Sequence, residues 1–185
     1  MKKLLFLAVA LLTSVIAMAD IEVKSGSMAE LKNSDARITV KWDYSKMLIE
    51  KMKPAEFLKK KGADWQRDYP AEVAAGEAAF VVWANKKCKK FAQITDMKAD
   101  AQYEYIIHVD HFDYGSTAAA IMFGGFARGA SMQGTIEVKN RKTKQTICTL
   151  EVDCAGKAAY GNEARRQLLM MDIAEDLAKT IKKAK

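Results

Sequence analysis

The sequence lacks the short motifs that identify the best-known catalytic chemistries. It contains no Gly-x-Ser-x-Gly nucleophile motif, no Cys-x-x-Cys redox pair and no His-Glu-x-x-His zinc motif. A glycine-rich stretch at residues 124–129 has neither the Lys-Ser/Thr of a P-loop nor the spacing of a dinucleotide fingerprint. These absences favour a protein that acts by binding or assembly, without a cofactor, over an enzyme.

Long hydrophobic runs are absent after residue 19, so no transmembrane helix is predicted there. The N-terminus has two lysines at residues 2–3, an apolar run over residues 4–16 and a small-x-small sequence at residues 17–19. This pattern predicts a signal peptide over residues 1–19.

Cleavage is predicted before Asp20, and because that residue is not cysteine, lipid attachment there is not expected. The protein is therefore expected to be exported, periplasmic or associated with the outer membrane, and soluble after cleavage. Residues 20–185 suit a single domain.

Cysteine is scarce, and three residues is an odd number for an exported protein. Cys148 and Cys154 fall on the same face of one predicted strand, about 20 Å apart, whereas a disulfide requires Cα atoms within about 7 Å. They are not expected to pair. The sequence leaves open whether Cys88 pairs with either of them.

The chain is basic, with a formal net charge of +7. Its densest lysine clusters, in residues 86–90 and 182–185, fall at predicted helix C-termini, where the helix dipole favours cations. Because this explains the clusters, and because nucleic acid fits badly with export, no nucleic-acid partner is predicted.

Residues 103–154 predict three β-strands at the centre of the fold. Apolar and polar residues alternate along 132–139 and again along 148–154, which predicts a hairpin with one buried face. A strand over residues 101–112 precedes this hairpin. Two earlier strands, residues 21–24 and 37–44, are expected to pair antiparallel.

Prolines and glycines delimit the predicted helices. Pro54 begins a short helix that Gly62 ends, and Pro70 is expected to prevent a continuous helix across it. The main helix is therefore predicted from about Ala71 to Lys90, and a last helix follows residue 162. The elements have the order β-β-α-β-β-β-α. This predicts an α+β, two-layer fold with a mostly antiparallel sheet of about five strands and two main helices packed on it.

Five segments of the chain carry a resemblance to known proteins. They are Trp42-Asp43-Tyr44-Ser45, Asp64-Trp65-Gln66-Arg67-Asp68-Tyr69-Pro70, Phe112-Asp113-Tyr114-Gly115-Ser116, Ile121-Met122-Phe123-Gly124-Gly125-Phe126 and the hairpin over residues 135–144. With the order of elements, they resemble small exported bacterial proteins of unknown function. These are similar in layout to the N-terminal domain of TolB and the core domain of CsgG. The resemblance implies a non-catalytic envelope domain and transfers no catalytic residue. Such relatives often have glycine where this chain has Lys144, so Lys144 is expected to adopt an unfavourable φ.

Both histidines lie in a cluster of metal-ligand types formed by His108, Asp110, His111 and Asp113. Zinc requires three or four ligands that converge on one point. On a regular strand, His108 and Asp110 point to one face while His111 and Asp113 point to the other, so no metal site is predicted. A metal-dependent hydrolase using His108, Asp110 and His111 is the alternative.

The apolar segment over residues 118–130 is the main candidate for a partner surface, because exposed apolar patches mark interaction sites. The alternative is that Ile121, Met122 and Phe123 pack under the edge of the sheet as part of the core. Trp65 is a further candidate. The expected partners are an envelope protein or a second copy of the chain, with peripheral membrane contact as another option. A small-ligand carrier using the surface around Trp42 and Trp65 is a third interpretation. The candidate residues of the segment are Ile121, Met122, Phe123, Phe126 and Arg128.

Cleavage before Asp20 is testable by mass spectrometry of the protein recovered from the envelope fraction. The expected mass is that of residues 20–185 with no added lipid. A retained Met1, or the mass of an attached acyl chain, would contradict the predicted signal peptide.

Overall fold

The computed structural model describes residues 20–32, 35–115 and 128–185, and the predicted signal peptide lies outside these ranges. The described residues form three α-helices and a seven-stranded sheet with the order β1-β7-β6-β5-β2-β4, in which β3 also pairs with β5. The strands are β1 (Asp20–Gly26), β2 (Arg37–Asp43), β3 (Leu48–Ile49), β4 (Gln93–Ile94), β5 (Tyr103–Asp113), β6 (Arg128–Asn140) and β7 (Thr146–Lys157). The helices are α2 (Pro54–Lys61), α3 (Ala63–Lys87) and α5 (Asn162–Lys183), with 3-10 turns η1 (Ala29–Lys32) and η2 (Lys98–Asp100).

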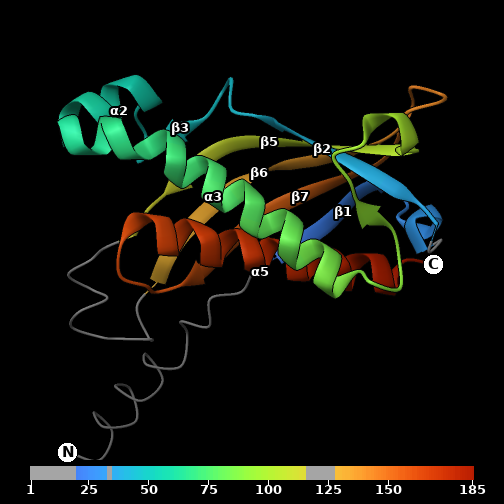
Figure 1. Ribbon diagram of the computed structural model, residues 1–185. Coiled ribbons are helices and arrows are strands. Elements are labelled where there is room, and N and C mark those ends of the chain that lie inside the picture. Colours follow the sequence, from blue (N-terminus) through green and yellow to red (C-terminus); the bar gives the residue numbers. More distant parts are fainter. Residues whose placement is uncertain (1–19, 33–34, 116–127) are drawn as a thin grey trace, which may run out of the picture.

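The helices α3 and α5 lie next to each other on one face of the sheet, and α2 lies beyond one end of it (Figure 1). The predicted last helix has an apolar stripe that faces the sheet, in which Met170, Ile173, Leu177 and Ile181 are all buried. They pack over the inner residues of β6 and β7, such as Ile136 and Leu150. No described helix covers the opposite face of the sheet.

The α+β class and the mostly antiparallel sheet are confirmed, but the predicted number and order of strands are wrong. The two additional strands, β3 and β4, are two residues long, too short to show an alternating pattern. The predicted pairing of the first two strands is also wrong. The strand β1 pairs antiparallel with β7, and β2 pairs parallel with β5. Parallel neighbours require a long crossover, which α2 and α3 provide.

The predicted interruption at Pro70 is wrong, since α3 runs through it. Proline removes one N–H, the one that would have reached the carbonyl of Gln66. Gln66 and Pro70 are both exposed, so water can solvate that carbonyl. The buried stripe of the helix consists of residues four apart, which are Glu72, Gly76, Phe80, Ala84 and Cys88.

A buried ion pair joins α3 to α5. The Nε of Arg166 donates to Oε1 of Glu72 at 2.8 Å, and its Nη2 donates to the hydroxyl of Tyr114 at 3.0 Å. That hydroxyl donates in turn to Oε1 of Glu72 at 2.5 Å, and burial raises the pKa of Tyr114. The guanidinium lies 3.9 Å from the ring centroid of Phe112. Gly76 makes room for this arrangement, because a Cβ there would stand 2.7 Å from Cγ of Arg166.

The three cysteines are buried thiols. Because β7 is continuous from Thr146 to Lys157, Cys148 and Cys154 stay six residues apart on one strand and are not bonded to each other. Burial raises the pKa of Cys88 to about 11, which keeps that thiol protonated at neutral pH.

The expected strain at Lys144 is confirmed, because its φ is 63°. The residue closes the β6–β7 hairpin, where its N–H donates to the carbonyl of Asn140 at 2.8 Å. The side chain of Asn140 accepts hydrogen bonds from the N–H groups of Lys142 and Thr143, and these contacts hold the turn.

Replacing Arg166 with methionine should lower the free energy of unfolding by about 3–5 kcal/mol, because Glu72 would remain buried without its cation. Chemical denaturation measures this. The double variant Arg166→Met/Glu72→Leu should recover a large part of the loss, since it removes both charges. Arg67→Met is the matched control, because its partners Asp64 and Asp68 are exposed. A single Arg166 variant as stable as the Arg67 control would contradict the prediction.

Candidate functional site

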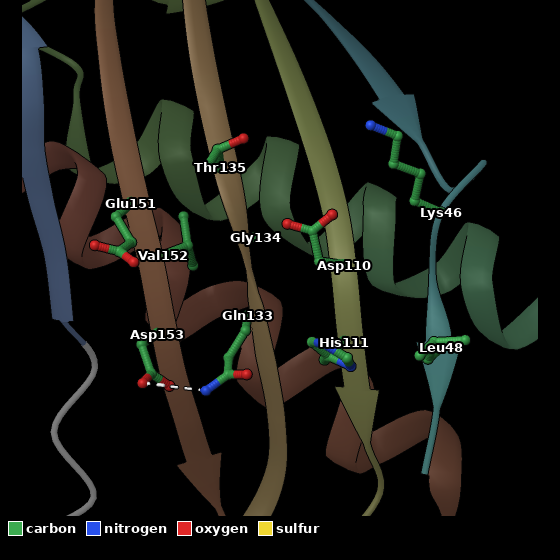
Figure 2. A pocket seen from close by; sticks show the side chains of 10 residues that line it. All are labelled: Lys46, Leu48, Asp110, His111, Gln133, Gly134, Thr135, Glu151, Val152 and Asp153. Carbon is green, nitrogen blue, oxygen red and sulfur yellow. Dashed lines mark hydrogen bonds between the residues drawn. The ribbon is translucent and has the colours of Figure 1, made fainter. Parts of the chain in front are cut away.

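The uncovered face of the sheet has a groove along β5, formed by three adjoining depressions of about 510, 330 and 250 Å³. The largest shares Asp110 and Thr135 with the smallest, and it shares His111 and Gln133 with the third. We call this surface the β5 groove. Its walls come from segments within residues 43–51, 108–113, 131–137 and 151–153. In Figure 2 the helices lie behind the strands, so the groove opens away from them.

A β-bulge at Asp110 aligns the polar residues of this groove. Val109 pairs with Gly134 of β6 and His111 pairs with Gln133, which leaves Asp110 as the extra residue. The bulge shifts the alternation by one position. His108, Asp110, His111 and Asp113 therefore all lie on the uncovered face, and the prediction that they divide between two faces is wrong.

His108 is held between two carboxylates. Its Nδ1 lies 2.9 Å from Oδ2 of Asp43, and its Nε2 lies 3.5 Å from Oε1 of Glu137. Hydrogen bonds from Ser45, and then one from His108, lower the pKa of Asp43 to about 2. The backbone N–H of Ser45 donates to Asp43 Oδ1 at 3.0 Å. The histidine thus lies in a negative environment on the surface of the sheet.

Although His108, Asp110 and His111 share one face, they do not converge. Within residues 20–32, 35–115 and 128–185 there is no group of three or more histidine, cysteine or acidic residues that could hold a metal ion. The alternative of a metal-dependent hydrolase therefore has no metal centre in this part of the chain.

The central part of the uncovered face carries more carboxylates than lysines, although the chain as a whole is basic. On the outer faces of β5, of β6 from Ser131 on and of β7 up to Asp153, six carboxylates accompany Lys139 and the two histidines. Two of the carboxylates have lysine partners, since Glu137 pairs with Lys139 at 3.0 Å and Glu151 pairs with Lys24 of β1. Four residues that line the largest depression were recognisable from the sequence only as the polar sides of strands, namely Gln133, Thr135, Glu151 and Asp153. The six carboxylates are Glu104, Asp110, Asp113, Glu137, Glu151 and Asp153.

One end of the groove is formed by a strained turn. Glu50 and Lys51, with φ of 47° and 68°, are consecutive residues in the left-handed region. The turn is closed by mutual backbone hydrogen bonds between Ile49 and Met52, and the N–H of Glu50 donates to the carbonyl of Phe112. Such strain persists where the surrounding structure fixes it, and it is frequent at functional sites.

The aromatic residues proposed for a small-ligand site pack into the core. Trp65, in the first turn of α3, contacts Phe57 and Tyr114 edge-to-face, with ring centroids 5.4 and 5.1 Å apart. Trp42 packs on Tyr44 and edge-to-face on Phe80. The space around these rings is occupied by other rings, which does not favour a small-ligand carrier.

Part of the predicted partner surface falls outside the described residues. The residues in question are Ile121, Met122, Phe123 and Phe126. Arg128 begins β6, and the structure describes its backbone. No helix among the described residues is long and apolar enough to cross a membrane.

The lowered pKa of Asp43 predicts how stability depends on pH. A carboxyl whose pKa is lower in the folded chain than its ordinary 3.8 stabilises the fold above that value and loses this effect as pH falls towards 2. We therefore expect Asp43→Asn to destabilise the protein near neutral pH. The difference from the parent should shrink between about pH 4 and pH 2. Denaturation across a pH series measures it. Ser45→Ala should reproduce the trend in part, and a difference that stays constant to pH 2 would contradict it.

No family model matches the sequence, and no curated protein matches it. Among solved structures, the chain is similar to a PelC dodecamer from Paraburkholderia phytofirmans, with a TM-score of 0.46, 11% identity, and 84% of this chain and 96% of that chain covered. It is also similar to a PelC variant from the same organism, with a TM-score of 0.45 and 13% identity; 86% of this chain and 97% of that chain are covered. A third similar structure is protein XCC0632 from Xanthomonas campestris, of the DUF330 family, with a TM-score of 0.39 and 9% identity. The match covers 88% of this chain and 90% of that chain. None of the three carries the name of an enzyme. None is a TolB or CsgG domain, so that resemblance stays a prediction.

Proposed function

We propose that this chain is a non-catalytic protein of the cell envelope that binds a basic, extended segment of a partner protein in the β5 groove. The supporting observation is the seven-stranded sheet itself, which has α3 and α5 on one face and no described helix on the other. The envelope location rests on the predicted signal peptide.

The shape of the groove favours an extended partner over a small molecule. Small molecules are usually bound in concave pockets that enclose most of their surface. Here the three depressions follow β5 from His108 to Asp113 and form one open, elongated groove; Figure 2 shows the residues that line the largest of them. An extended peptide matches this shape, with alternate side chains facing the sheet.

Charge complementarity favours a basic partner. Asp110 and Asp153 line the largest depression together with Glu151, which pairs with Lys24 of β1, and Lys46 is the lysine among the lining residues. In a chain of net charge +7, this concentration of carboxylates is local. An acidic groove attracts a cationic segment and repels other copies of itself, so charge would set both the rate of encounter and the choice of partner.

The surroundings of His108 support a binding role rather than catalysis. A catalytic histidine usually has a nucleophile or a reacting group within hydrogen-bonding reach of its second nitrogen. Here one nitrogen contacts Asp43, and the other faces the carboxylate of Glu137 at 3.5 Å. The histidine thereby joins β5 to β2 through Asp43 and faces Glu137 of β6.

The apolar segment remains in the proposal as a second contact surface. Trp65 packs on Phe57 and Tyr114 but is only partly buried, so we include the part of its ring that is exposed. The sequence of the segment is apolar, with Arg128 as the one charged residue between residues 118 and 130. Such a composition suits contact with a partner protein or another copy of the chain.

Photo-crosslinking in cells tests the groove. A photoreactive residue at Gln133 or His111, both exposed in the groove, should give a discrete adduct with a partner protein. Val82 on α3 is 66% exposed on the helical side of the molecule and is the matched control position. The adducts should be lost in the variant Asp110→Lys/Asp153→Lys, because a basic segment would be repelled.

Peptide mapping of the adduct identifies the crosslinked segment, which should be rich in lysine or arginine. Equal adducts at Val82, adducts that survive the charge reversal, or a crosslinked segment without basic residues would each count against the proposal. If the crosslinked segment came from a second copy of the chain, the proposed partner protein would be wrong and the groove would serve self-association.

A further inference from the structure

The two helix C-termini with their lysines lie at the same end of the molecule. The ends of α3 and α5 lie near each other in Figure 1, beside η1 and the C-terminus of the chain, whereas α2 lies at the opposite end. Lys87 of α3 forms an ion pair with Glu175 of α5 at 2.7 Å. The N–H of Ala92 donates to the carbonyl of Leu31 in η1, and the hydroxyl of Ser27 donates to the carbonyl of Lys185.

This arrangement brings together eight exposed lysines, which are Lys32 and those of residues 86–90 and 182–185. We call this surface the basic end. The acidic residues of η1 and of the C-terminal half of α5 are Glu30, Asp172, Glu175 and Asp176, and Asp176 pairs with Lys179. Glu175 already pairs with Lys87, and Glu30 accepts a hydrogen bond from the hydroxyl of Tyr103.

Helix capping does not explain the whole cluster. The effect of the helix dipole is confined to about the last turn. Lys89 and Lys90 follow the C-cap residue Cys88, Lys185 follows the C-cap residue Ala184, and Lys32 belongs to a different element. These four lysines lie outside the helical residues of α3 and α5, yet they extend the same charged surface.

Two partly exposed aromatic side chains lie within this surface. Trp83 is contacted by Lys86 and Lys87, whose Nζ atoms stand 4.3 and 5.0 Å from its ring centroid. Phe91 follows Lys90 and is also partly buried against the core. Basic residues interspersed with interfacial aromatic residues are typical of surfaces that contact lipid headgroups.

We infer that the basic end docks the protein onto an anionic phospholipid membrane. The choice of lipid over nucleic acid rests on the envelope location proposed above, whereas the geometry of the surface is independent of the β5 groove. Docked in this way, the uncovered face of the sheet stands to the side of the contact and remains accessible to a partner.

Sedimentation with vesicles tests this docking. The protein is purified in the form that its producing cells contain. It is then mixed either with vesicles of phosphatidylcholine alone or with vesicles of phosphatidylcholine that contain about 30% phosphatidylglycerol. Binding is expected only to the anionic vesicles. It should disappear as the salt concentration rises from about 0.05 to 0.5 M, because salt screens exposed charges.

Two variants with the same loss of charge separate a local site from net charge. Lys89→Gln/Lys90→Gln/Lys183→Gln should weaken partitioning by about fivefold for each lysine, or roughly a hundredfold in total. Lys53→Gln/Lys59→Gln/Lys60→Gln changes three exposed lysines of the α2 region at the opposite end, and should weaken partitioning far less. Matching denaturation curves confirm that both variants are folded.

An equal loss in both variants, equal binding to neutral vesicles, or no binding to anionic vesicles would overturn the inference. If the protein bound a DNA oligonucleotide but no vesicles, the inferred membrane docking would be wrong, and the basic end would instead bind another polyanion. The crosslinks in the β5 groove are a separate measurement, so failure of the docking and failure of the proposed function can be told apart.

Discussion

The contact between Glu72 and Arg166 determines how the helical layer lies on the sheet. A buried charge pair gives little net stability on its own, but it is costly to separate, so it selects arrangements in which both partners meet. Here the pair fixes α3 against α5, and Tyr114, which follows β5, joins both charges. The guanidinium stacks on Phe112, the last inward-facing side chain of β5. A shift of either helix by one turn would leave a charge buried without a partner.

This fixed helical layer makes the two faces of the sheet different in kind. The inner side chains are apolar and packed, while the charged side chains on the outer faces of β5, β6 and β7 are mostly carboxylates. Most of the lysines lie elsewhere, on and beside α2, at the ends of α3 and α5, and in the β6–β7 turn, whereas Lys46 and Lys139 lie on the uncovered face. A basic protein thus carries an acidic face, and the two proposals assign these opposite charges to two different partners.

Much of the architecture follows from local patterns that the sequence displays. Alternation identified β5, β6 and β7, and Pro54 with Gly62 delimited α2. The groove was beyond such reasoning because it depends on register. Nothing in the local sequence marks Asp110 as a bulge. If the same residues of β5 alternated regularly from Val109 on, His111 would face the core. The buried pair was hidden for a similar reason, because Glu72 and Arg166 are 94 residues apart and each resembles a surface residue of a helix.

The bulge at Asp110 has a consequence for how the length of this chain can vary. An insertion or deletion within a strand normally turns every later side chain to the opposite face. Here Tyr105, Ile107 and Val109 face inward before the bulge, and Phe112 and Tyr114 are buried after it. A chain without residue 110 would alternate regularly and keep all five of these side chains in the core. The middle of β5 is therefore a position where sequences of different length can share one hydrophobic core while differing in the surface they present to a partner.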